Sequence, residues 1–162
     1  MHPLLIVELL ILVAVANGTP VLAKRLLGDT LNRPLDGGAV FADGRPWFGP
    51  AKTVRGIVLS LLATPLAACL MGLPWRLGFV VAAAAMAGDL LSSFVKRRMG
   101  LASSSKATGL DQIPESLLPL AASRLVVAVS LADILAGTLI FLVGSVILSR
   151  ILFALRLRDQ PY

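Results

Sequence analysis

Hydrophobic residues occupy most of the chain in long runs, and polar segments separate these runs. The first three runs each predict one transmembrane helix, at residues 4–23, 54–73 and 77–95. A fourth run extends from Ile113 to Leu155 with few interruptions. As a single helix it would be about 65 Å long, or twice the thickness of a bilayer core of about 30 Å. We therefore expect two helices there, at 113–130 and 134–155.

Individual residues bear on the continuity of the first helix and on the position of the turn between the last two helices. Asn17-Gly18-Thr19-Pro20 predicts a break or kink near the inner end of the first helix. A cleaved signal peptide is the alternative for this segment, because Ala14-Val15-Ala16 resembles a cleavage site. Glu8 lies inside the run and no basic residue precedes it, which favours a retained helix. The turn between the last two helices is expected near Ser130 to Asp133.

Two polar loops connect the helices, and the basic residues indicate the orientation of the chain. The first loop and its flank contain six of them: Lys24, Arg25, Arg33, Arg45, Lys52 and Arg55. The second loop and the C-terminal tail contain Lys96, Arg97, Arg98, Lys106, Arg156 and Arg158. The positive-inside rule then places both loops and the C-terminus in the cytoplasm, with the N-terminus outside.

These observations predict an all-α integral membrane protein that crosses the cell membrane several times. It should be one domain, residues 1–162, built as a bundle of about five transmembrane helices with two cytoplasmic polar loops. Composition supports this class, since 57% of residues are hydrophobic and 15% are charged. Average globular chains have about 45–50% and about 25%.

Charge and residue usage narrow the chemistry. The net charge of +6 is mostly a topology signal, so we expect no nucleic-acid partner. His2 is the one histidine, which argues against a Ser-His-Asp triad and against a histidine-based metal site. A metal would be held by carboxylates and other oxygens, a donor set that favours Mg²⁺.

The third predicted helix contains an acidic residue at an unusual depth. Asp89 precedes Lys96 by seven residues, or about 10 Å along the helix axis. A carboxylate inside an apolar segment is a candidate functional residue. Helical spacing puts four side chains on one face: Asp89, Ser92, Ser93 and Lys96. This face could bind a metal and an anionic group, although a purely structural pairing of Asp89 with Lys96 or with a neighbouring helix is the alternative.

Small and charged residues in the two loops face the same side as the inner end of this helix. The first loop contains Asp36-Gly37-Gly38, Asp43-Gly44-Arg45 and the segment Gly49 to Gly56. Glycine lets the backbone approach a phosphate, and Lys and Arg supply positive charge. The second loop ends in Asp111, which could meet Asp89 and share Mg²⁺. The combination indicates phosphoryl or nucleotidyl transfer on a lipid, although turns and anchoring cations could have the same composition.

The residues from Gly88 to Arg97 resemble the GDxxxSxxKR core of phosphatidate cytidylyltransferases. Leu110-Asp111-Gln112 resembles their LDR motif, in the LDQ form of a shorter relative, the CDP-archaeol synthase family. The resemblance to that family covers nearly the whole chain, including Asn17 to Pro20, Asp36 to Gly38, Asp43 to Arg45 and Lys52 to Gly56. It departs from the longer relatives at Ser103 to Thr108, where a KD pair and an HGG turn are replaced. Pro114 stands where a second acid often follows, and Glu115 is its candidate substitute.

The resemblance implies transfer of CMP from CTP to a lipid phosphate, with release of pyrophosphate and with Mg²⁺ as cofactor. Asp89 and Asp111 match the metal-binding acids, and Lys96 joins them as a candidate catalytic residue. Ser93 and Arg97 match positions around the nucleotide phosphates. The other candidate substrate-binding residues are Asn17, Asp36, Gly37, Gly38, Asp43, Arg45, Lys52, Thr53 and Arg55. The expected partners are CTP, the lipid phosphate and membrane lipids.

Two other functions remain open at this point. A CDP-alcohol phosphotransferase also uses aspartates in a helical bundle, and Asp36-Gly37 and Asp43-Gly44 imitate the start of its motif without the clustered aspartates that follow. A small transporter or scaffold could use Asp89 as an ion site, although the inverted repeats typical of transporters are not evident. The sequence also leaves open which lipid phosphate is used and whether the chain forms a homodimer.

Overall fold

The computed structural model describes residues 2–103, 105, 107 and 109–154, with the helix backbone alone at 148–154. The predicted cytoplasmic cations Lys106, Arg156 and Arg158 lie outside the described residues. This part of the chain forms α1 (Pro3–Leu27), α2 (Val54–Leu70), α3 (Trp75–Arg98), α4 (Gln112–Ala122), a 3₁₀ turn η1 (Ser123–Leu125) and α5 (Leu131–Ala154). Its β pairing is limited to two isolated bridges, Pro34–Thr53 and Val40–Pro46. The all-α prediction is confirmed.

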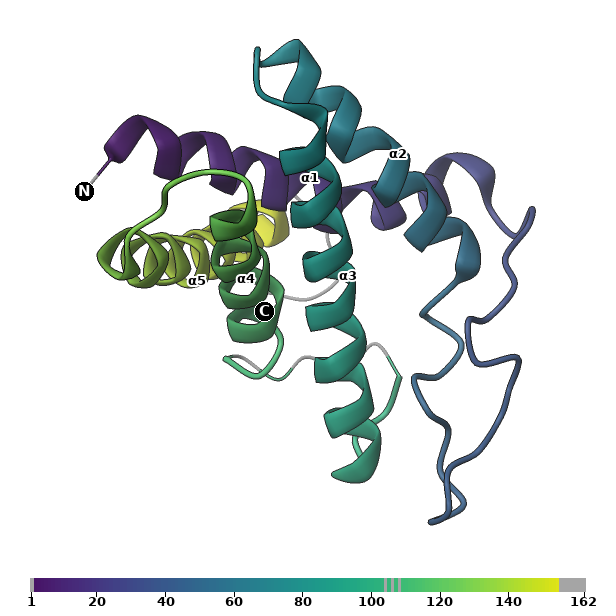
Figure 1. The fold of residues 1–162 in the computed structure, drawn as a ribbon. Coiled ribbons are helices and arrows are strands. Elements are labelled where there is room, and N and C mark those ends of the chain that lie inside the picture. Colours follow the sequence, from purple (N-terminus) through teal and green to yellow (C-terminus); the bar gives the residue numbers. More distant parts are fainter. Residues whose placement is uncertain (1, 104, 106, 108, 155–162) are drawn as a thin grey trace.

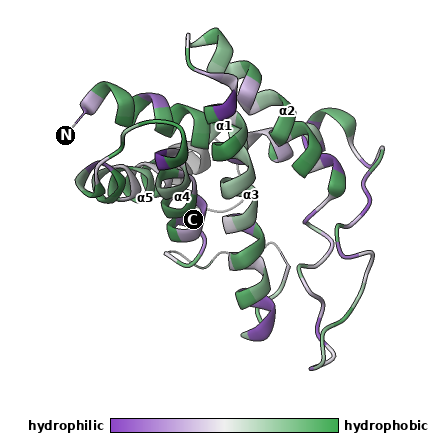
Figure 2. Ribbon diagram, viewed as in Figure 1, coloured by the Kyte–Doolittle hydropathy of each residue, from purple (hydrophilic) through white to green (hydrophobic). Residues whose placement is uncertain are grey.

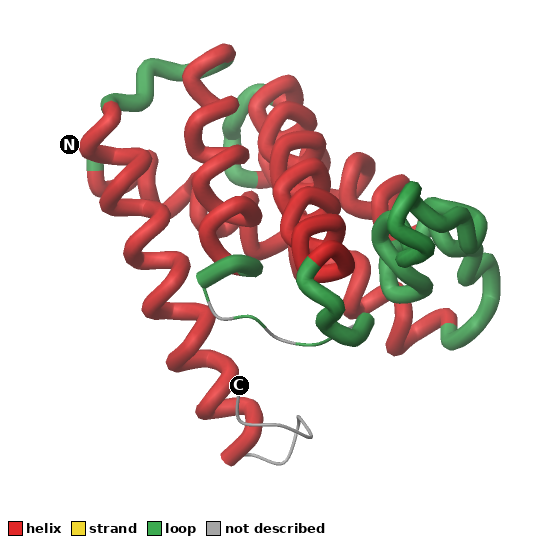
Figure 3. Tube along the Cα trace, turned by 90° about the horizontal axis from the view of Figure 1, so that it is seen from below, coloured by secondary structure: helices red, strands yellow, loops and turns green. Residues whose placement is uncertain are grey.

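The helices pack around α3. In Figure 1, α4 lies alongside α3, and α1 crosses behind them. Helix α2 packs against α1 and α3, on the side of α3 that faces away from α4. The core between them is made of side chains from several helices: Leu9, Leu12, Val13, Ala68, Leu77, Val81, Leu120 and Ile134. Residues 28–53 form a lobe beside the helices (Figure 3), which we call the 28–53 lobe.

Helix α1 continues through Pro20, so of the predicted break or kink at Asn17 to Pro20 the break is wrong. A proline in a helix has no N–H and leaves the carbonyl four residues earlier without its usual partner. That carbonyl belongs to Ala16, and it accepts a hydrogen bond of 2.9 Å from the Ser60 hydroxyl of α2. A neighbouring helix therefore supplies the missing donor, and the helix persists.

The fourth helix is shorter than predicted, because α4 ends at Ala122 and η1 ends at Leu125. The connection to α5 occupies Val126 to Ser130, upstream of the predicted turn. Asp133 belongs to the first turn of α5, where its carboxylate accepts the Ser130 N–H (3.1 Å) and hydroxyl (2.6 Å), and Ser130 Oγ accepts the Asp133 N–H. This capping box starts a helix without any glycine or proline.

Two glycines let α3 approach its neighbours closely. A Cβ atom on Gly88 would overlap the backbone carbonyl of Pro114 in α4. A Cβ atom on Gly78 would lie 2.6 Å from the carbonyl oxygen of Thr64 and from the Cα of Pro65 in α2. Only glycine therefore fits at these contacts. Because Asp89 follows Gly88, the first contact also brings Asp89 close to α4.

The helices consist mostly of hydrophobic residues, as the colouring of the ribbon in Figure 2 shows. Exposed leucines repeat every four residues along α2 (Leu62, Leu66, Leu70) and α5 (Leu131, Leu135, Leu139). α1 and α3 are long and apolar enough to cross a membrane, and α2 (Val54–Leu70) is apolar but shorter. In α5, the stretch whose side chains are described, Leu131–Ile147, is also apolar. Polar residues collect at the C-terminal end of α3 and in the loops. Such surfaces are suited to lipid rather than water.

Replacing Gly88 with Ala should destabilise the protein, because the added methyl group forces α3 away from Pro114. We expect a loss of about 1–3 kcal/mol, measured as a lower Tm of the full-length chain in detergent. Gly144→Ala in α5 is the matched control, because a Cβ atom added there would meet no neighbouring atom within 4 Å. Equal melting temperatures for the two variants would contradict the tight α3–α4 contact.

Candidate functional site

Asp36 organises the 28–53 lobe from within. Its carboxylate accepts hydrogen bonds from the backbone N–H groups of Gly38 (3.1 Å), Phe48 (3.0 Å) and Gly49 (2.9 Å). Burial favours the neutral acid, but these N–H donors outweigh it and lower the pKa of Asp36. Gly37 and Gly38 form the adjoining turn with positive φ angles of 56° and 83°. These three predicted substrate-binding residues therefore shape the lobe.

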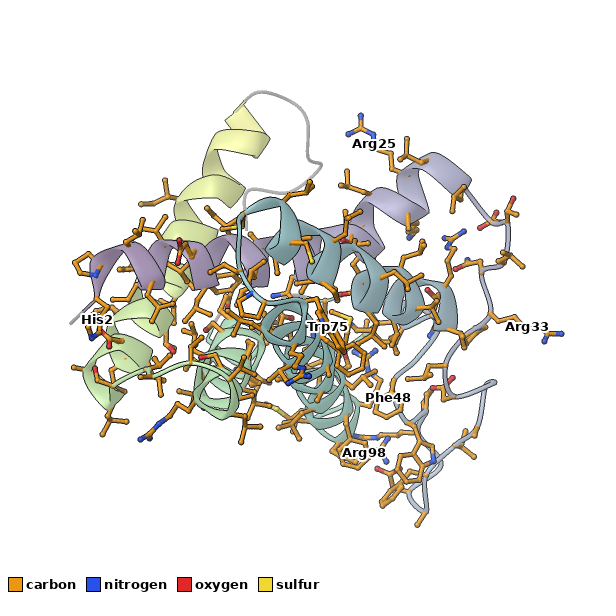
Figure 4. The ribbon with its side chains drawn as sticks, turned by 45° about the horizontal axis from the view of Figure 1, so that its top comes forward. His2, Arg25, Arg33, Phe48, Trp75 and Arg98 are labelled. Atoms are coloured by element: carbon orange, nitrogen blue, oxygen red, sulfur yellow. The ribbon has the colours of Figure 1, made fainter. Side chains whose placement is uncertain are left out.

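The tip of the lobe is fastened to the last turn of α3. Asp43 forms an ion pair with Arg98 (2.8 Å). Arg45 donates to the carbonyl oxygens of Arg97 (3.3 Å) and Arg98 (2.5 Å), which the end of a helix leaves without helical partners. Figure 4 places Arg98 where the lobe meets α3, with its guanidinium 4.9 Å from the ring centroids of Phe41 and Phe94. Asp43 and Arg45, also predicted to bind substrate, are tethers in this structure.

A cavity of about 80 Å³ lies between the lobe, α3 and the loop that follows α3. Seven of the described residues line it: Phe48, Ala51, Lys52, Ser93, Lys96, Arg97 and Ser103. Three of them are cations. Arg97 Nε and Ser103 Oγ are buried and have no hydrogen-bond partner among the described residues. Positive charge with unused donors fits an anion that has several oxygens, such as a phosphate group.

Two lysine–aspartate pairs adjoin this cavity. Lys52 Nζ lies 2.5 Å and 2.6 Å from the two carboxylate oxygens of Asp89. Lys96 Nζ lies 2.6 Å from Asp111 and also donates to the Ser105 carbonyl at 2.9 Å. The sequence predicted Asp89 and Lys96 on one helix face, but each of them pairs with a residue from a different segment. Asp89 and Asp111 therefore lie at one end of the bundle, each neutralised by its own lysine.

Glu115 and Asn17 complete the polar cluster from α4 and α1. Glu115 lies within hydrogen-bonding reach of Asp89 and near enough to Lys52 and Asp111 for their charges to act on it. The Asn17 amide contacts the Glu115 carbonyl at 3.5 Å, which is the carbonyl that Pro119 leaves free. The oxygen of the Asn17 amide, Oδ1, is buried and has no hydrogen-bond partner among the described residues.

The oxygen donors of this cluster fit a divalent cation of the magnesium type. No three Asp, Glu, His or Cys side chains converge on one point within the described residues. Mg²⁺ at phosphate sites commonly uses one or two carboxylates, with water and substrate phosphates as its other ligands. Asp89 and Asp111 are the candidate carboxylates, and Glu115 lies beside Asp89. The Asn17 amide nitrogen donates to the Glu115 carbonyl, and its oxygen Oδ1 has no partner in the described residues.

Two other predicted substrate-binding residues lie away from the cavity. Arg55 is buried, and its guanidinium donates to the carbonyl oxygens of Gly28 and Thr30 at the base of the lobe. Thr53 caps α2 by accepting the Gly56 N–H at 3.2 Å. Both residues hold the lobe on the helices.

The structure also brings in cavity residues that were not predicted, namely Phe48, Ala51 and Ser103. Phe48 and Ala51 carry no chemical signal in the sequence. Ser103 belongs to a run of serines, which is notable in the sequence only because this segment differs from the longer relatives.

Comparisons with known proteins point to one family. The family model described as CarS-like, CDP-archaeol synthase, matches residues 71–162. CDP-archaeol synthase from Pyrobaculum islandicum is 33% identical, with 91% of this chain and 92% of that protein covered. The chain belongs to the CDP-archaeol synthase family. The enzyme of that name from Pyrobaculum calidifontis is 34% identical over 97% of this chain and 98% of its own length.

The family also accounts for the fold. A solved structure of an intramembrane enzyme for archaeal membrane lipid biosynthesis has a TM-score of 0.70 to this chain and 33% identity. The match covers 86% of this chain and 89% of the other. This member of the CDP-archaeol synthase family is therefore a membrane-embedded protein. The family model spans α3 to α5 with Asp89, Lys96 and Asp111, whereas the lobe with Lys52 precedes it.

The lowered pKa of Asp36 predicts how the lobe responds to acid. The folded lobe favours the carboxylate, so this contribution is fully present above about pH 4 and is lost as the pH falls through the lower folded pKa. We expect the fluorescence of Trp47, in a Trp75→Phe background, to report loosening of the lobe only in that acid range. Asp36→Asn should loosen the lobe at neutral pH, where unchanged fluorescence would contradict its organising role.

Proposed function

We propose that this protein is a CTP-dependent cytidylyltransferase that converts a membrane lipid phosphate of the archaetidic or phosphatidic acid type into a CDP-lipid. The observation that carries the proposal is the cavity lined by Lys52, Lys96 and Arg97 beside two aspartates. Family membership supports the same reaction.

The reaction needs positioning and charge neutralisation more than proton transfer. A phosphate oxygen of the lipid attacks the α-phosphorus of CTP, a new P–O bond forms, and the bond to the β-phosphate breaks to release pyrophosphate. The nucleophile is already an anion, so no general base is required. Lys52, Lys96 and Arg97 would bind the nucleotide phosphates, and Ser93 and Ser103 can donate hydrogen bonds to them.

Asp89 and Asp111, with Glu115 beside them, would hold Mg²⁺. When bound, that ion would neutralise charge on the phosphates during the transfer. The apolar helix faces keep the protein in the membrane, where the lipid phosphate is found. Asn17 is the residue of α1 that would face this cluster.

We also propose the complete topology, with residues 1–162 as one domain that crosses the membrane five times, the fourth crossing being made by the short α4 together with η1 and the connection to α5. Basic residues concentrate in the 28–53 lobe and at the end of α3. The bonds from Asp43 and Arg45 to the end of α3 put these two regions at the same end of the bundle. Five crossings with cytoplasmic loops leave the N-terminus outside and the C-terminus inside.

The activity is tested with CTP labelled at the α-phosphate and a panel of lipid phosphates, using the purified full-length protein and Mg²⁺. Label should enter the lipid fraction as a CDP-lipid, identified by mass spectrometry, with one pyrophosphate released per product. Release of CMP from a CDP-lipid on addition of an alcohol, without use of CTP, would instead indicate a CDP-alcohol phosphotransferase.

Asp89→Asn should lower kcat by at least about 10²-fold, the scale on which one electrostatic element contributes to an active site. The amide keeps the size of the side chain but removes its negative charge, so it weakens binding of a divalent cation. Excess Mg²⁺ should rescue the activity partially at most. A matching Tm would show that the variant is folded, and near-wild-type turnover in that folded protein would overturn the metal-binding role.

Arg97→Ala should raise the KM for CTP about 10- to 100-fold, because a charge-assisted contact is worth about 1.5–3 kcal/mol. Arg55→Ala is the comparison, since Arg55 bonds to backbone carbonyls at the base of the lobe. It should lower the Tm more than it changes the KM for CTP. If Arg55→Ala raised the KM as much as Arg97→Ala at unchanged Tm, Arg55 would be a nucleotide-binding residue after all.

The topology is tested with single cysteines in a Cys69→Ala background. Cysteines at positions 40 and 105 should react with an impermeant reagent only from the cytoplasmic side, and a cysteine at position 75 only from outside. The first two positions lie in the predicted cytoplasmic regions, and the third follows α2. Labelling of positions 40 and 105 from opposite sides would rule out the five-crossing arrangement.

A further inference from the structure

Lys52 adjoins both groups on which the proposed reaction depends. Its ammonium nitrogen contacts both carboxylate oxygens of Asp89, at 2.5 Å and 2.6 Å. The same residue lines the cavity assigned above to the nucleotide phosphates. An ammonium group placed on both oxygens puts its positive charge beside the lone pairs that a divalent cation would use. Lys52 therefore competes with the cation for Asp89.

The backbone of Lys52 is fixed, so an exchange of partners involves the side chain alone. Lys52 N–H donates to the Gly49 carbonyl (3.2 Å), and the Lys52 carbonyl accepts from Leu35 (2.7 Å). The side chain is 24% exposed, and within the described residues its ammonium bonds to Asp89 alone. A lysine is a flexible point charge and can move from one anion to another without meeting strict geometry.

Lys96 is held differently, which makes Lys52 the exchangeable lysine. Lys96 contacts Asp111 at 2.6 Å and the Ser105 carbonyl at 2.9 Å, and its side chain is only 9% exposed. Moving it would break two contacts in a more buried place and leave the Ser105 carbonyl without this donor.

The charge of Asp89 makes the departure of Lys52 depend on the arrival of another cation. If Lys52 left on its own, the Asp89 carboxylate would remain without its counterion in a partly buried site, which is unfavourable. A divalent cation would replace that counterion, and a nucleotide phosphate would give the lysine a new partner.

We propose that Lys52 is a positioning residue that occupies Asp89 before ligands bind and transfers to the phosphates of CTP, which makes CTP and the divalent cation bind cooperatively. The proposal rests on the function proposed above. Because such coupling is reciprocal, CTP should raise the affinity for the cation by the factor by which the cation raises the affinity for CTP.

The cation arm of the test uses Mn²⁺ as an EPR-visible probe, with full-length protein in detergent and no lipid phosphate. Without CTP, Lys52→Met should bind Mn²⁺ about tenfold more tightly than the wild type, because Asp89 is released. Arg97→Met is the matched control, since it removes a charge from the same cavity but leaves the Lys52–Asp89 pair intact. Its affinity should change less than about threefold. Lys52→Gln is a second neutral variant if Lys52→Met does not fold, and Lys52→Arg should keep the weak affinity.

The nucleotide arm measures CTP binding by equilibrium dialysis, with and without Mn²⁺. Mn²⁺ should tighten CTP binding to the wild type about tenfold more than to the neutral Lys52 variants. Equal Mn²⁺ affinity of wild type and those variants, or an equal gain in Arg97→Met, would overturn the role of Lys52 even if CTP binds normally. Failure of CTP to bind the wild type would instead overturn the proposed function.

Discussion

Charged groups at the end of an apolar helix bundle must be paired, and this constraint sets the arrangement of the site. Lys52–Asp89 joins the 28–53 lobe to α3, and Lys96–Asp111 joins α3 to the segment before α4. Each pair links parts of the chain that are distant in sequence or separated by a loop. Partly buried ion pairs add little net stability, because desolvation offsets most of their attraction, but breaking one leaves an uncompensated charge. Their main effect is to select this arrangement over others.

A second constraint is that backbone carbonyls in an apolar environment need donors. Pro20 and Pro119 each free a carbonyl within a helix, at Ala16 and Glu115. Ser60 of α2 donates to the first, and Asn17 of α1 contacts the second. The helices thus recognise one another where their own hydrogen bonding is interrupted. The second interruption lies beside the acids of the site, so the same contact helps to bring α1 to the polar cluster.

Short-range patterns in the sequence were enough to predict most of the helices and part of the candidate site. Hydrophobic runs located the helices, and helical spacing put Ser93 and Lys96 on the face of α3 that lines the cavity. The errors came from partners that a local pattern cannot show. Ser60 is distant in sequence from the Ala16 carbonyl that it satisfies, so Pro20 looked like a helix break. Lys96 was the partner that local spacing offered for Asp89, whereas the actual partner, Lys52, lies 37 residues away. The start of α5 could have been found, since Ser130 and Asp133 have the spacing of a capping box.

The structure separates two kinds of cation that the sequence treats alike. Arg45, Arg55 and Arg98 direct guanidinium N–H groups at backbone carbonyls, so they hold the lobe on the helices. A planar guanidinium with several fixed donors is suited to such permanent contacts, whereas an ammonium group can change partners. Lys52 and Lys96 instead pair with carboxylates beside the cavity. Arg97 also donates to a backbone carbonyl, that of Ala102, but unlike the other three arginines it lines the cavity. The positive charge near a bound phosphate would therefore come from Lys52, Lys96 and Arg97, the cations that line the cavity.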